Sequence, residues 1–337
     1  MFPTDKKMKL ITILIPAYNE EANLPRLKEH LDMLAADRFP KQKTARPGLR
    51  SEDAPSMTDY EWEFLFVDDG SRDNTLEELY RLRQADPRVS IVSLSRNFGK
   101  ENAMLAGMDY AKGDAVVIMD ADLQHPVSAI PEMIYWWERG YEDVYGRRKQ
   151  RGKESWLRKR LSLAFYSMLQ GTTRIEILPN VGDFRLLDRR AVKAICALRE
   201  TQRYTKGLYC WVGYNKKEIL FEQHDRAEGK SSFNLKGLIN LAVEGITCFT
   251  TAPLRISTII GLVLSVLSMI YLVVILIKTI FWGEAVQGFP TLMCTILLLG
   301  SLQLIALGII GEYIGRIFNE TKQRPPYIVE AYNGKKI

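Results

Sequence analysis

The chain has 337 residues, 47% of them hydrophobic, which is enough for one large domain or two smaller ones with a buried core. Its 46 basic and 40 acidic residues leave a net charge of +6, a mild excess that suits phosphorylated substrates or anionic lipid and gives poor support for nucleic-acid binding. The four cysteines lack CxxC spacing, so the sequence predicts reduced thiols. The amino-terminal residues lack a long apolar run, so no signal peptide is predicted.

The first βαβ half-unit is predicted near the amino terminus. Leu10 to Ile15 is dense in β-branched residues and predicts a strand, and Glu21 to Ala36 has apolar residues at helical spacing. In the turn between them, Tyr18 and Asn19 are candidates to stack on and hydrogen-bond a base, with ordinary turn chemistry as the alternative. Residues 39–60 show no periodicity and predict a surface loop insertion.

A second strand, Glu63 to Val67, ends in the tandem acids Asp68 and Asp69. Asp73 or Thr75 can cap the predicted helix over residues 76–84. One of the acids is a candidate to hold a base or ribose, and the alternative is that all of them cap and turn.

A third strand, Val89 to Leu94, is followed by two cations and a glycine, Arg96 to Lys100. A helix is predicted over residues 101–111. Cations beside a helix amino terminus suit phosphate, although a solvated basic turn would have the same composition.

The fourth strand, residues 116–119, leads directly into Asp120 and Asp122. Two carboxylates this close repel each other unless a cation lies between them or one takes up a proton. A hard divalent ion with oxygen ligands, bridging a diphosphate, would resolve the repulsion. A polar turn after a strand is the alternative, but three successive strand ends bearing polar, mostly acidic residues favour a site at the carboxyl edge of the sheet.

Downstream, residues 147–153 form a dense cationic run and residues 156–170 are amphipathic, which is typical of a helix at a membrane interface. A solvated helix on the globular domain is the alternative. Asp183 precedes a short apolar run, and Arg226 and Lys230 follow a late strand over residues 218–222.

Two uncharged apolar runs lie in the carboxyl-terminal third, Ile256 to Ile277 and Phe289 to Gly311. Each is long enough to cross a bilayer as a helix. Arg255 precedes the first run and Arg316 follows the second, so both chain ends are predicted on the cytoplasmic side. A pair of buried helices in a soluble protein is the weaker alternative.

Taken in order, residues 15–21 (IPAYNEE), 67–71 (VDDGS), 95–100 (SRNFGK) and 120–126 (DADLQHP), followed by two membrane helices, resemble the polyprenyl-phosphate glycosyltransferases of glycosyltransferase family 2. This group contains dolichyl-phosphate mannose synthase and the bacterial bactoprenol glucosyltransferases, and the bacterial branch fits better. The resemblance covers nearly the whole chain, although residues 39–60 are longer than expected.

The resemblance implies an α/β GT-A (Rossmann-like) catalytic domain with amphipathic interface helices and a carboxyl-terminal transmembrane hairpin. It implies Mg²⁺ or Mn²⁺, a nucleotide-sugar donor and a polyprenyl-phosphate acceptor. Asp122 and Asp183 are the expected catalytic residues and Asp120, Asp122 and Gln124 the expected metal ligands. The expected nucleotide-sugar site comprises Pro16, Tyr18, Asn19, Glu20, Asp68, Asp69, Lys100 and Asp120, and the expected lipid-phosphate site comprises Arg147, Arg148, Arg160, Arg226 and Lys230.

The expected reaction is inverting transfer of a hexose, glucose from UDP-glucose, to undecaprenyl phosphate at the bacterial inner membrane. Donors carrying galactose, mannose, N-acetylglucosamine or aminoarabinose remain alternatives, as does a non-catalytic, membrane-anchored nucleotide-binding module. A processive polysaccharide synthase is disfavoured because the chain lacks a Gln-x-x-Arg-Trp motif.

The predicted organisation is a cytoplasmic catalytic domain over residues 1–230, a juxtamembrane helix over 231–253, two transmembrane helices over 254–315 and a cytoplasmic tail over 316–337. The amphipathic helices could also pack between protomers of a homo-oligomer such as a tetramer.

Overall fold

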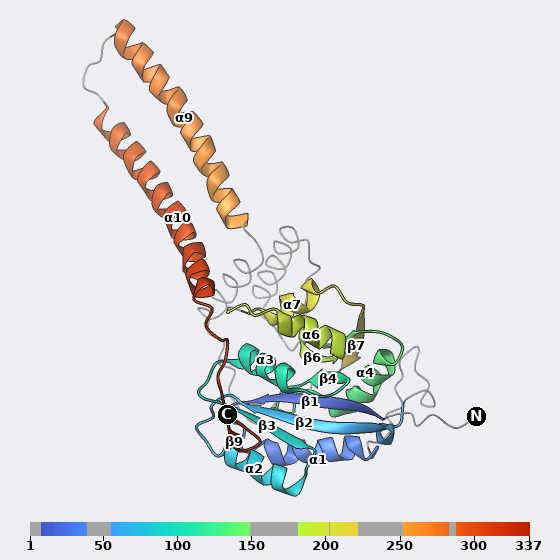
Figure 1. Ribbon diagram of the computed structural model, residues 1–337. Coiled ribbons are helices and arrows are strands. Elements are labelled where there is room, and N and C mark those ends of the chain that lie inside the picture. The colour runs from blue at the N-terminus through green and yellow to red at the C-terminus, as the bar shows by residue number, and fades with distance from the viewer. Residues whose placement is uncertain (1–7, 39–54, 149–180, 202, 222–251, 283–287) are drawn as a thin grey trace. The chain divides into compact units, whose positions relative to one another are not determined.

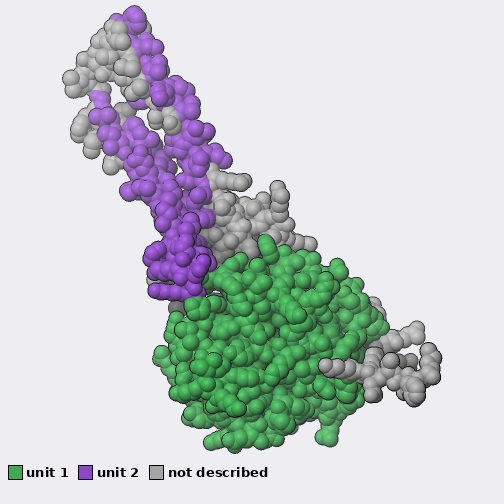
Figure 2. Space-filling model, viewed as in Figure 1, with its two compact units in different colours: residues 1–170, 174–234, 325–337 green, residues 171–173, 235–324 purple. Residues whose placement is uncertain are grey.

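The computed structural model describes residues 8–38, 55–148, 181–201, 203–221, 252–282 and 288–337 (Figure 1). The chain divides into two compact units (Figure 2): residues 1–170, 174–234 and 325–337 form unit 1, and residues 171–173 and 235–324 form unit 2. The predicted interface helix and juxtamembrane helix, and most of the predicted loop, lie outside the described residues.

Unit 1 is built on a nine-stranded sheet in the order β7-β5-β6-β4-β1-β2-β3-β8-β9. Four parallel strands, β4, β1, β2 and β3, form its centre, and their carboxyl ends lie at one edge. The strand bounds are β1 Lys9–Ala17, β2 Tyr60–Asp68, β3 Val89–Leu94, β4 Ala115–Ile118, β5 Asp143–Arg148, β6 Val181–Asp188, β7 Lys216–Phe221, β8 Val329–Tyr332 and β9 Lys335–Lys336.

Helices cover both faces of the sheet, which explains why its central strands are apolar without a break. Ile11, Ile13 and Ile15 pack in a core with α1, α2 and α4, whereas Leu14 and Val67 pack in a second core with α3, α6 and α7. The helices are α1 Leu24–Ala35, α2 Thr75–Ala85, α3 Lys100–Tyr110, α4 Ile130–Trp137, α6 Arg189–Ala197 and α7 Thr205–Trp211, with short 3-10 turns η1 Met57–Asp59 and η2 Val127–Ala129.

Helix α3 approaches the sheet closely at Gly107. A Cβ atom there would lie 1.9 Å from Cδ1 of Leu14 on β1 and 2.9 Å from Cγ2 of Val67 on β2. Only glycine avoids this overlap, so Gly107 sets the distance between α3 and the two central strands. The amino-terminal residue of this helix, Lys100, is thereby placed at the carboxyl edge of the sheet.

On the other side of β4 the sheet is mixed, because β6 is antiparallel to β4 and β5, whereas β5 and β7 are parallel. β6 pairs antiparallel with β4, with Ile118 opposite Arg185. Arg185 forms a buried ion pair with Asp143 of β5, with Nη1 2.9 Å from Oδ2, and its guanidinium lies over the ring of Tyr209. Because a buried charge without a partner is costly, this contact fixes the placement of β5, β6 and α7 together.

The last described strands join the same nine-stranded sheet, which the sequence interpretation of residues 316–337 as a cytoplasmic tail did not anticipate. β8 pairs antiparallel with β3. The Asn333 side chain accepts a hydrogen bond from the Ile91 amide (2.8 Å), and the Tyr327 hydroxyl donates to Asp109 on α3. β8 therefore covers an edge that β3 would otherwise expose.

Unit 2 contains two long helices, α9 Ala252–Trp282 and α10 Phe289–Thr321, which contact each other. Within the described residues, the stretch Leu298–Thr321 of α10 is long and apolar enough to cross a membrane, and Ser257–Tyr271 of α9 is a shorter apolar stretch. Large apolar side chains on both helices are exposed, for example Leu262 (66%) and Leu304 (71%). α10 continues past the predicted boundary at residue 315.

Candidate functional site

The turn after β4 carries the paired acids. The backbone amide of Asp120 donates to Nδ1 of His125 (3.1 Å), and the amide of Gln124 donates to Oδ1 of Asp122 (3.1 Å). Leu123 adopts a left-handed conformation with φ of 61°, which lets the chain reverse directly after Asp122. The turn is therefore held by its own polar residues, with both acids at the edge of the sheet.

His125 anchors this turn, a role that the sequence analysis did not assign. Its ring is buried and stacks on Phe184 of β6, with the ring centroids 4.8 Å apart. Burial lowers the pKa of His125, so the imidazole is neutral near pH 7 and its Nδ1 can accept the Asp120 amide. Its position five residues after Asp120 in the motif was the only signal in the sequence.

Strand pairing brings Asp183 to the same edge of the sheet as Asp120. Ile118, the last residue of β4, pairs with Arg185, and Asp120 and Asp183 each lie two residues beyond this pair toward that edge. Lys100 completes the group: its Nζ lies 2.6 Å from Oδ1 of Asp120 and 2.9 Å from Oδ2 of Asp183. Three predicted site residues from three distant parts of the chain therefore meet at one point.

Electrostatics keep Asp183 ionised in a buried position. Burial alone would raise its pKa, but Lys100 together with Lys206 and Arg185 lowers the pKa to about 2. In turn, the carboxylates of Asp183 and Asp120 outweigh the effect of burial on Lys100 and raise its pKa. Oδ1 of Asp183 is buried and has no hydrogen-bond partner among the described residues, which indicates a place for a polar group of a substrate or for water.

A second acid, the half-buried Glu101 next to Lys100 in the chain, was not singled out from the sequence. It accepts a hydrogen bond from the Thr205 amide (3.1 Å) at the start of α7. Burial and the nearby Asp183 raise its pKa. Glu101 therefore connects α3 with α7.

The acids after β2 are buried and hold loops. Asp68 accepts the amide of Ser71 (3.2 Å). Asp69 accepts the amides of Phe98 (2.7 Å) and Gly99 (2.9 Å), so it positions the loop immediately before Lys100. Burial raises the pKa of both acids. Asp69 thus has a clear structural task beside any contact with nucleotide.

The turn after β1 lies beside them, because Ala17 pairs with Asp68 in the parallel register. Asn19 is left-handed (φ 56°), its amide donates to Ser71 and its side chain accepts the Arg72 amide (2.8 Å). Tyr18 is 38% exposed, as a ring that stacks on a base must be. Pro16 and Ala17 are the last residues of β1 that pair with β2. In the turn that follows, the backbone amide of Glu20 donates to the hydroxyl of Thr75 (2.9 Å).

The donor set fits a divalent cation. Asp120 and Asp122 offer hard oxygen ligands one residue apart, and Mg²⁺ and Mn²⁺ are commonly held by one or two carboxylates plus substrate phosphates. No group of three or more His, Cys, Asp or Glu residues suited to a metal occurs in the part of the chain that the structure describes. The remaining ligands would therefore have to come from substrate, water or Gln124, which is 9% exposed.

Comparison with known proteins identifies the family. Residues 12–196 match the model described as glycosyl transferase family 2, and residues 252–317 match the model described as GtrB C-terminal hairpin. The chain belongs to glycosyltransferase family 2. The α/β GT-A fold and the carboxyl-terminal hairpin expected from the sequence are confirmed.

Relatives of this family 2 glycosyltransferase align over nearly its whole length. It is 42% identical over 319 residues to an uncharacterized glycosyltransferase of Synechocystis, covering 95% of this chain and 94% of that one. It is 39% identical to a bactoprenol glucosyl transferase of Shigella phage SfV and 38% identical to a prophage bactoprenol glucosyl transferase homolog of Escherichia coli; each match covers 95% of this chain and 98% of the relative.

The family 2 enzyme's expected lipid-phosphate residues are only partly described. Arg147 and Arg148 are exposed at the end of β5, and Arg147 forms an ion pair with Glu218 (3.2 Å). Arg160, Arg226 and Lys230 lie outside the described residues.

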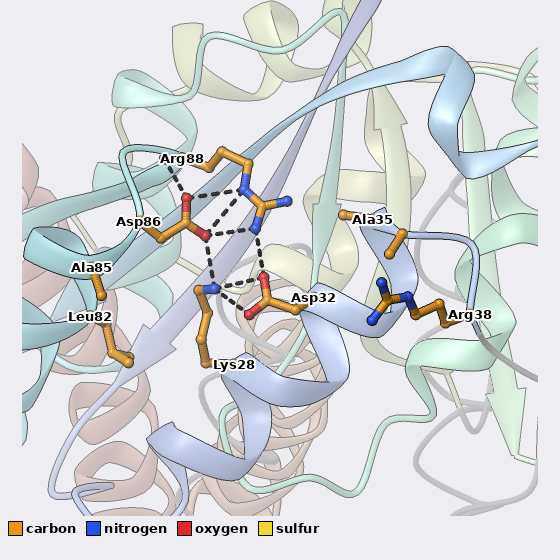
Figure 3. Close-up of a pocket in the computed structure, with 9 residues that line it drawn as sticks. Lys28, Asp32, Ala35, Arg38, Leu82, Ala85, Asp86 and Arg88 are labelled. Atoms are coloured by element: carbon orange, nitrogen blue, oxygen red, sulfur yellow. Dashed lines mark hydrogen bonds and ion pairs between the residues drawn. The ribbon is translucent and has the colours of Figure 1, made fainter.

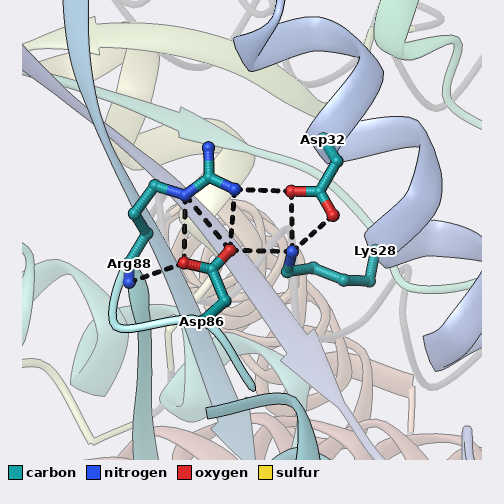
Figure 4. A network of polar contacts seen from close by, with 4 residues as sticks. All are labelled: Lys28, Asp32, Asp86 and Arg88. Carbon is teal, nitrogen blue, oxygen red and sulfur yellow. Dashed lines mark hydrogen bonds and ion pairs between the residues drawn. The ribbon is translucent and has the colours of Figure 1, made fainter. Parts of the chain in front are cut away.

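A cavity of about 720 Å³ lies away from this site, between α1, α2 and the start of β3 (Figure 3). Its lining is dominated by an ion network in which Lys28 and Arg88 each contact both Asp32 and Asp86 at 2.6 to 2.8 Å (Figure 4). The Arg88 and Lys28 charges overcome burial and lower the pKa of Asp86. Lys28 and Asp32 lie on α1, whereas Asp86 and Arg88 lie just before β3. Because the four charges pair with one another, we infer that the network joins α1 to the start of β3.

Proposed function

We propose that this family 2 glycosyltransferase transfers glucose from UDP-glucose to undecaprenyl phosphate and inverts the anomeric centre. The observation that carries the proposal is the similarity, over nearly the full length, to proteins named bactoprenol glucosyl transferase. The grouping of Asp120, Lys100 and Asp183 at the carboxyl edge of the sheet supports it, since this edge is where α/β sheets bind ligands.

In the proposed reaction, an oxygen of the acceptor phosphate attacks the anomeric carbon of the sugar. The new carbon–oxygen bond forms as the bond to the nucleoside diphosphate breaks, and its electron pair leaves with the diphosphate. A divalent cation at Asp120 and Asp122 would neutralise that charge when bound. The acceptor is already anionic near neutral pH, so it needs orientation more than proton removal.

The residues of the chain accordingly have orienting tasks. Asp183, with a pKa of about 2, is a weak base, and we assign it to positioning a polar group of the reactants through its unpartnered Oδ1. Arg147 and Arg148, with Arg160, Arg226 and Lys230, are proposed to receive the lipid phosphate, because arginine binds phosphate through paired donors. Pro16, Tyr18, Asn19, Glu20, Asp68 and Asp69 are proposed to line the nucleotide pocket.

We further propose that the hairpin spans the bacterial inner membrane with unit 1 in the cytoplasm. The two apolar runs and the basic residues that flank them support this placement. An acceptor whose long chain is dissolved in the bilayer requires its phosphate to meet the donor at the membrane surface.

The decisive experiment offers radiolabelled UDP-glucose, UDP-galactose, UDP-N-acetylglucosamine and GDP-mannose to the purified full-length protein with undecaprenyl phosphate. Each donor is tested with Mn²⁺, with Mg²⁺ and with EDTA. We expect glucose transfer that EDTA abolishes. Transfer from another donor would correct the sugar but keep the reaction, whereas no transfer from any donor by folded protein that still binds UDP would favour the binding-module alternative.

A further inference from the structure

Lys100 has a position that nucleotide binding alone does not explain. Its ammonium contacts a carboxylate expected to hold metal, Asp120, and the buried acid Asp183, at 2.6 and 2.9 Å. Asp120 lies in the turn after β4, Asp183 lies on the neighbouring strand β6, and Lys100 is the first residue of α3, which packs on the sheet. Lys100 therefore links α3, the turn after β4 and β6 at the carboxyl edge of the sheet.

Several contacts hold Lys100 in this place. Asp69 accepts the two amides immediately before it in the chain, from Phe98 and Gly99. Gly107 sets the depth at which its helix lies on β1 and β2. The ion pairs are thus a property of a well-supported backbone and not of a freely moving surface lysine.

The chemistry of the contact implies competition. A carboxylate oxygen that accepts an ammonium hydrogen bond is less available as a metal ligand, and a divalent cation bound there is repelled by the nearby positive charge. A diphosphate that arrives with the cation changes this balance, because it supplies further metal ligands and a second anion for the lysine.

We propose that Lys100 is a positioning residue that weakens divalent-cation binding at Asp120 until a nucleoside diphosphate is bound, and that it thereby couples cation and donor binding. The inference rests on the proposed function, since it takes Asp120 as a metal ligand. It assigns Lys100 a task beyond contact with the donor: the cation and the nucleotide bind tightly only together.

The test measures the dissociation constant of Mn²⁺ from the signal of free Mn²⁺ in electron paramagnetic resonance, without UDP and with saturating UDP. For wild type we expect weak binding alone and much tighter binding with UDP. For Lys100→Gln we expect Mn²⁺ alone to bind on the order of tenfold more tightly, because one positive charge is removed, and the gain from UDP to shrink. Lys100→Arg, which keeps the charge, should retain most of the coupling.

The matched control is Lys9→Gln. Lys9 has the same exposed side-chain fraction as Lys100, 43%, and forms an ion pair with Glu138 at 2.9 Å at the start of β1. This variant likewise loses one positive charge, together with one ion pair where the Lys100 variants lose two, and it should bind Mn²⁺ as wild type does. Melting temperatures of all variants verify folding, and Lys100→Met provides a second charge-free variant if Lys100→Gln is unstable.

Unchanged or weaker Mn²⁺ binding by the charge-free Lys100 variants would overturn the inference while leaving the proposed reaction intact. A purely structural lysine would lower the melting temperature without altering the coupling between Mn²⁺ and UDP. If wild type bound no Mn²⁺ even with UDP yet transferred sugar in EDTA, the metal assignment and this inference would both fall, and the transferase reaction would stand.

Discussion

At the scale of single residues, Asp122 is the most direct probe of the metal assignment. Its carboxylate takes part in its own turn by accepting the Gln124 amide, and an asparagine oxygen can keep that bond. We expect Asp122→Asn to fold normally and to lose at least about a hundredfold in turnover, because several kcal/mol of charge stabilisation is lost. The assay is glucose transfer at saturating donor.

Asp59→Asn is the control, since Asp59 is an exposed acid in η1 at the amino end of β2, whereas Asp122 follows the carboxyl end of β4. Near-normal turnover by folded Asp122→Asn would refute the assignment.

Asp183 predicts a pH dependence of stability. The pKa of Asp183 in the folded protein, about 2, lies below its ordinary value. Its contribution to the free energy of unfolding is therefore complete above the ordinary pKa and is lost as the pH falls towards 2. Between pH 6 and pH 3, the stability difference between wild type and Asp183→Asn should shrink by about 1 kcal/mol. Denaturant unfolding of both proteins in detergent at the two pH values measures it. A difference independent of pH would show that Lys100 does not stabilise the charged acid.

At this scale the sequence allowed candidate site residues to be proposed, but not the residues that they contact. The strand-end acids were visible because each follows an apolar run. The proximity of Asp183 to Asp120 was not, because it depends on an antiparallel register between strands far apart in the chain. Likewise Asp69 was predicted for nucleotide, whereas its two backbone hydrogen bonds could be seen only in the structure.

At the scale of elements, the fit of α3 on the sheet can be tested at Gly107. Alanine normally improves a helix by about 1 kcal/mol over glycine, but here its Cβ would overlap Leu14. We expect Gly107→Ala to lower the free energy of unfolding by about 1–3 kcal/mol. Gly182→Ala is the control, because the nearest atom to its Cβ is 4.0 Å away. Equal stability of the two variants would contradict the close approach.

The pairing of β8 with β3 can be tested at Asn333. Its side chain accepts the Ile91 amide, and its backbone is left-handed with φ of 53°. Asn333→Ala should cost about 1–2 kcal/mol through the lost acceptor and the strained backbone, and the Ile91 amide should exchange with deuterium faster. Asn333→Asp, which keeps an acceptor, should protect that amide. Unchanged exchange in Asn333→Ala would mean that β8 does not depend on this contact.

The four central strands and the helices between them were predictable, since apolar runs and helical spacing alternate regularly. β8 was not, because residues 329–332 include Glu330 and are short, so they carry no strand pattern of their own. Their conformation comes from pairing with β3, a tertiary effect.

At the scale of the whole molecule, the hairpin predicts a membrane topology. A single cysteine at Glu284, between α9 and α10, should react with a membrane-impermeant thiol reagent from outside intact spheroplasts, because the flanking basic residues favour the cytoplasm. A cysteine at Lys322, after α10, should react only after lysis. Both are placed in a variant lacking the four native cysteines. The reverse pattern would invert the orientation.

The paired strands also constrain how the chain can thread the bilayer. β7 precedes the hairpin and β8 follows it, yet both belong to one sheet. Hydrogen-bonded neighbours cannot be separated by a membrane, so if α9 and α10 enter the bilayer, the number of crossings between residues 221 and 329 must be even. Insertion of only one of the two helices would leave β3 without its antiparallel neighbour, which couples completion of the catalytic sheet to correct insertion of the hairpin.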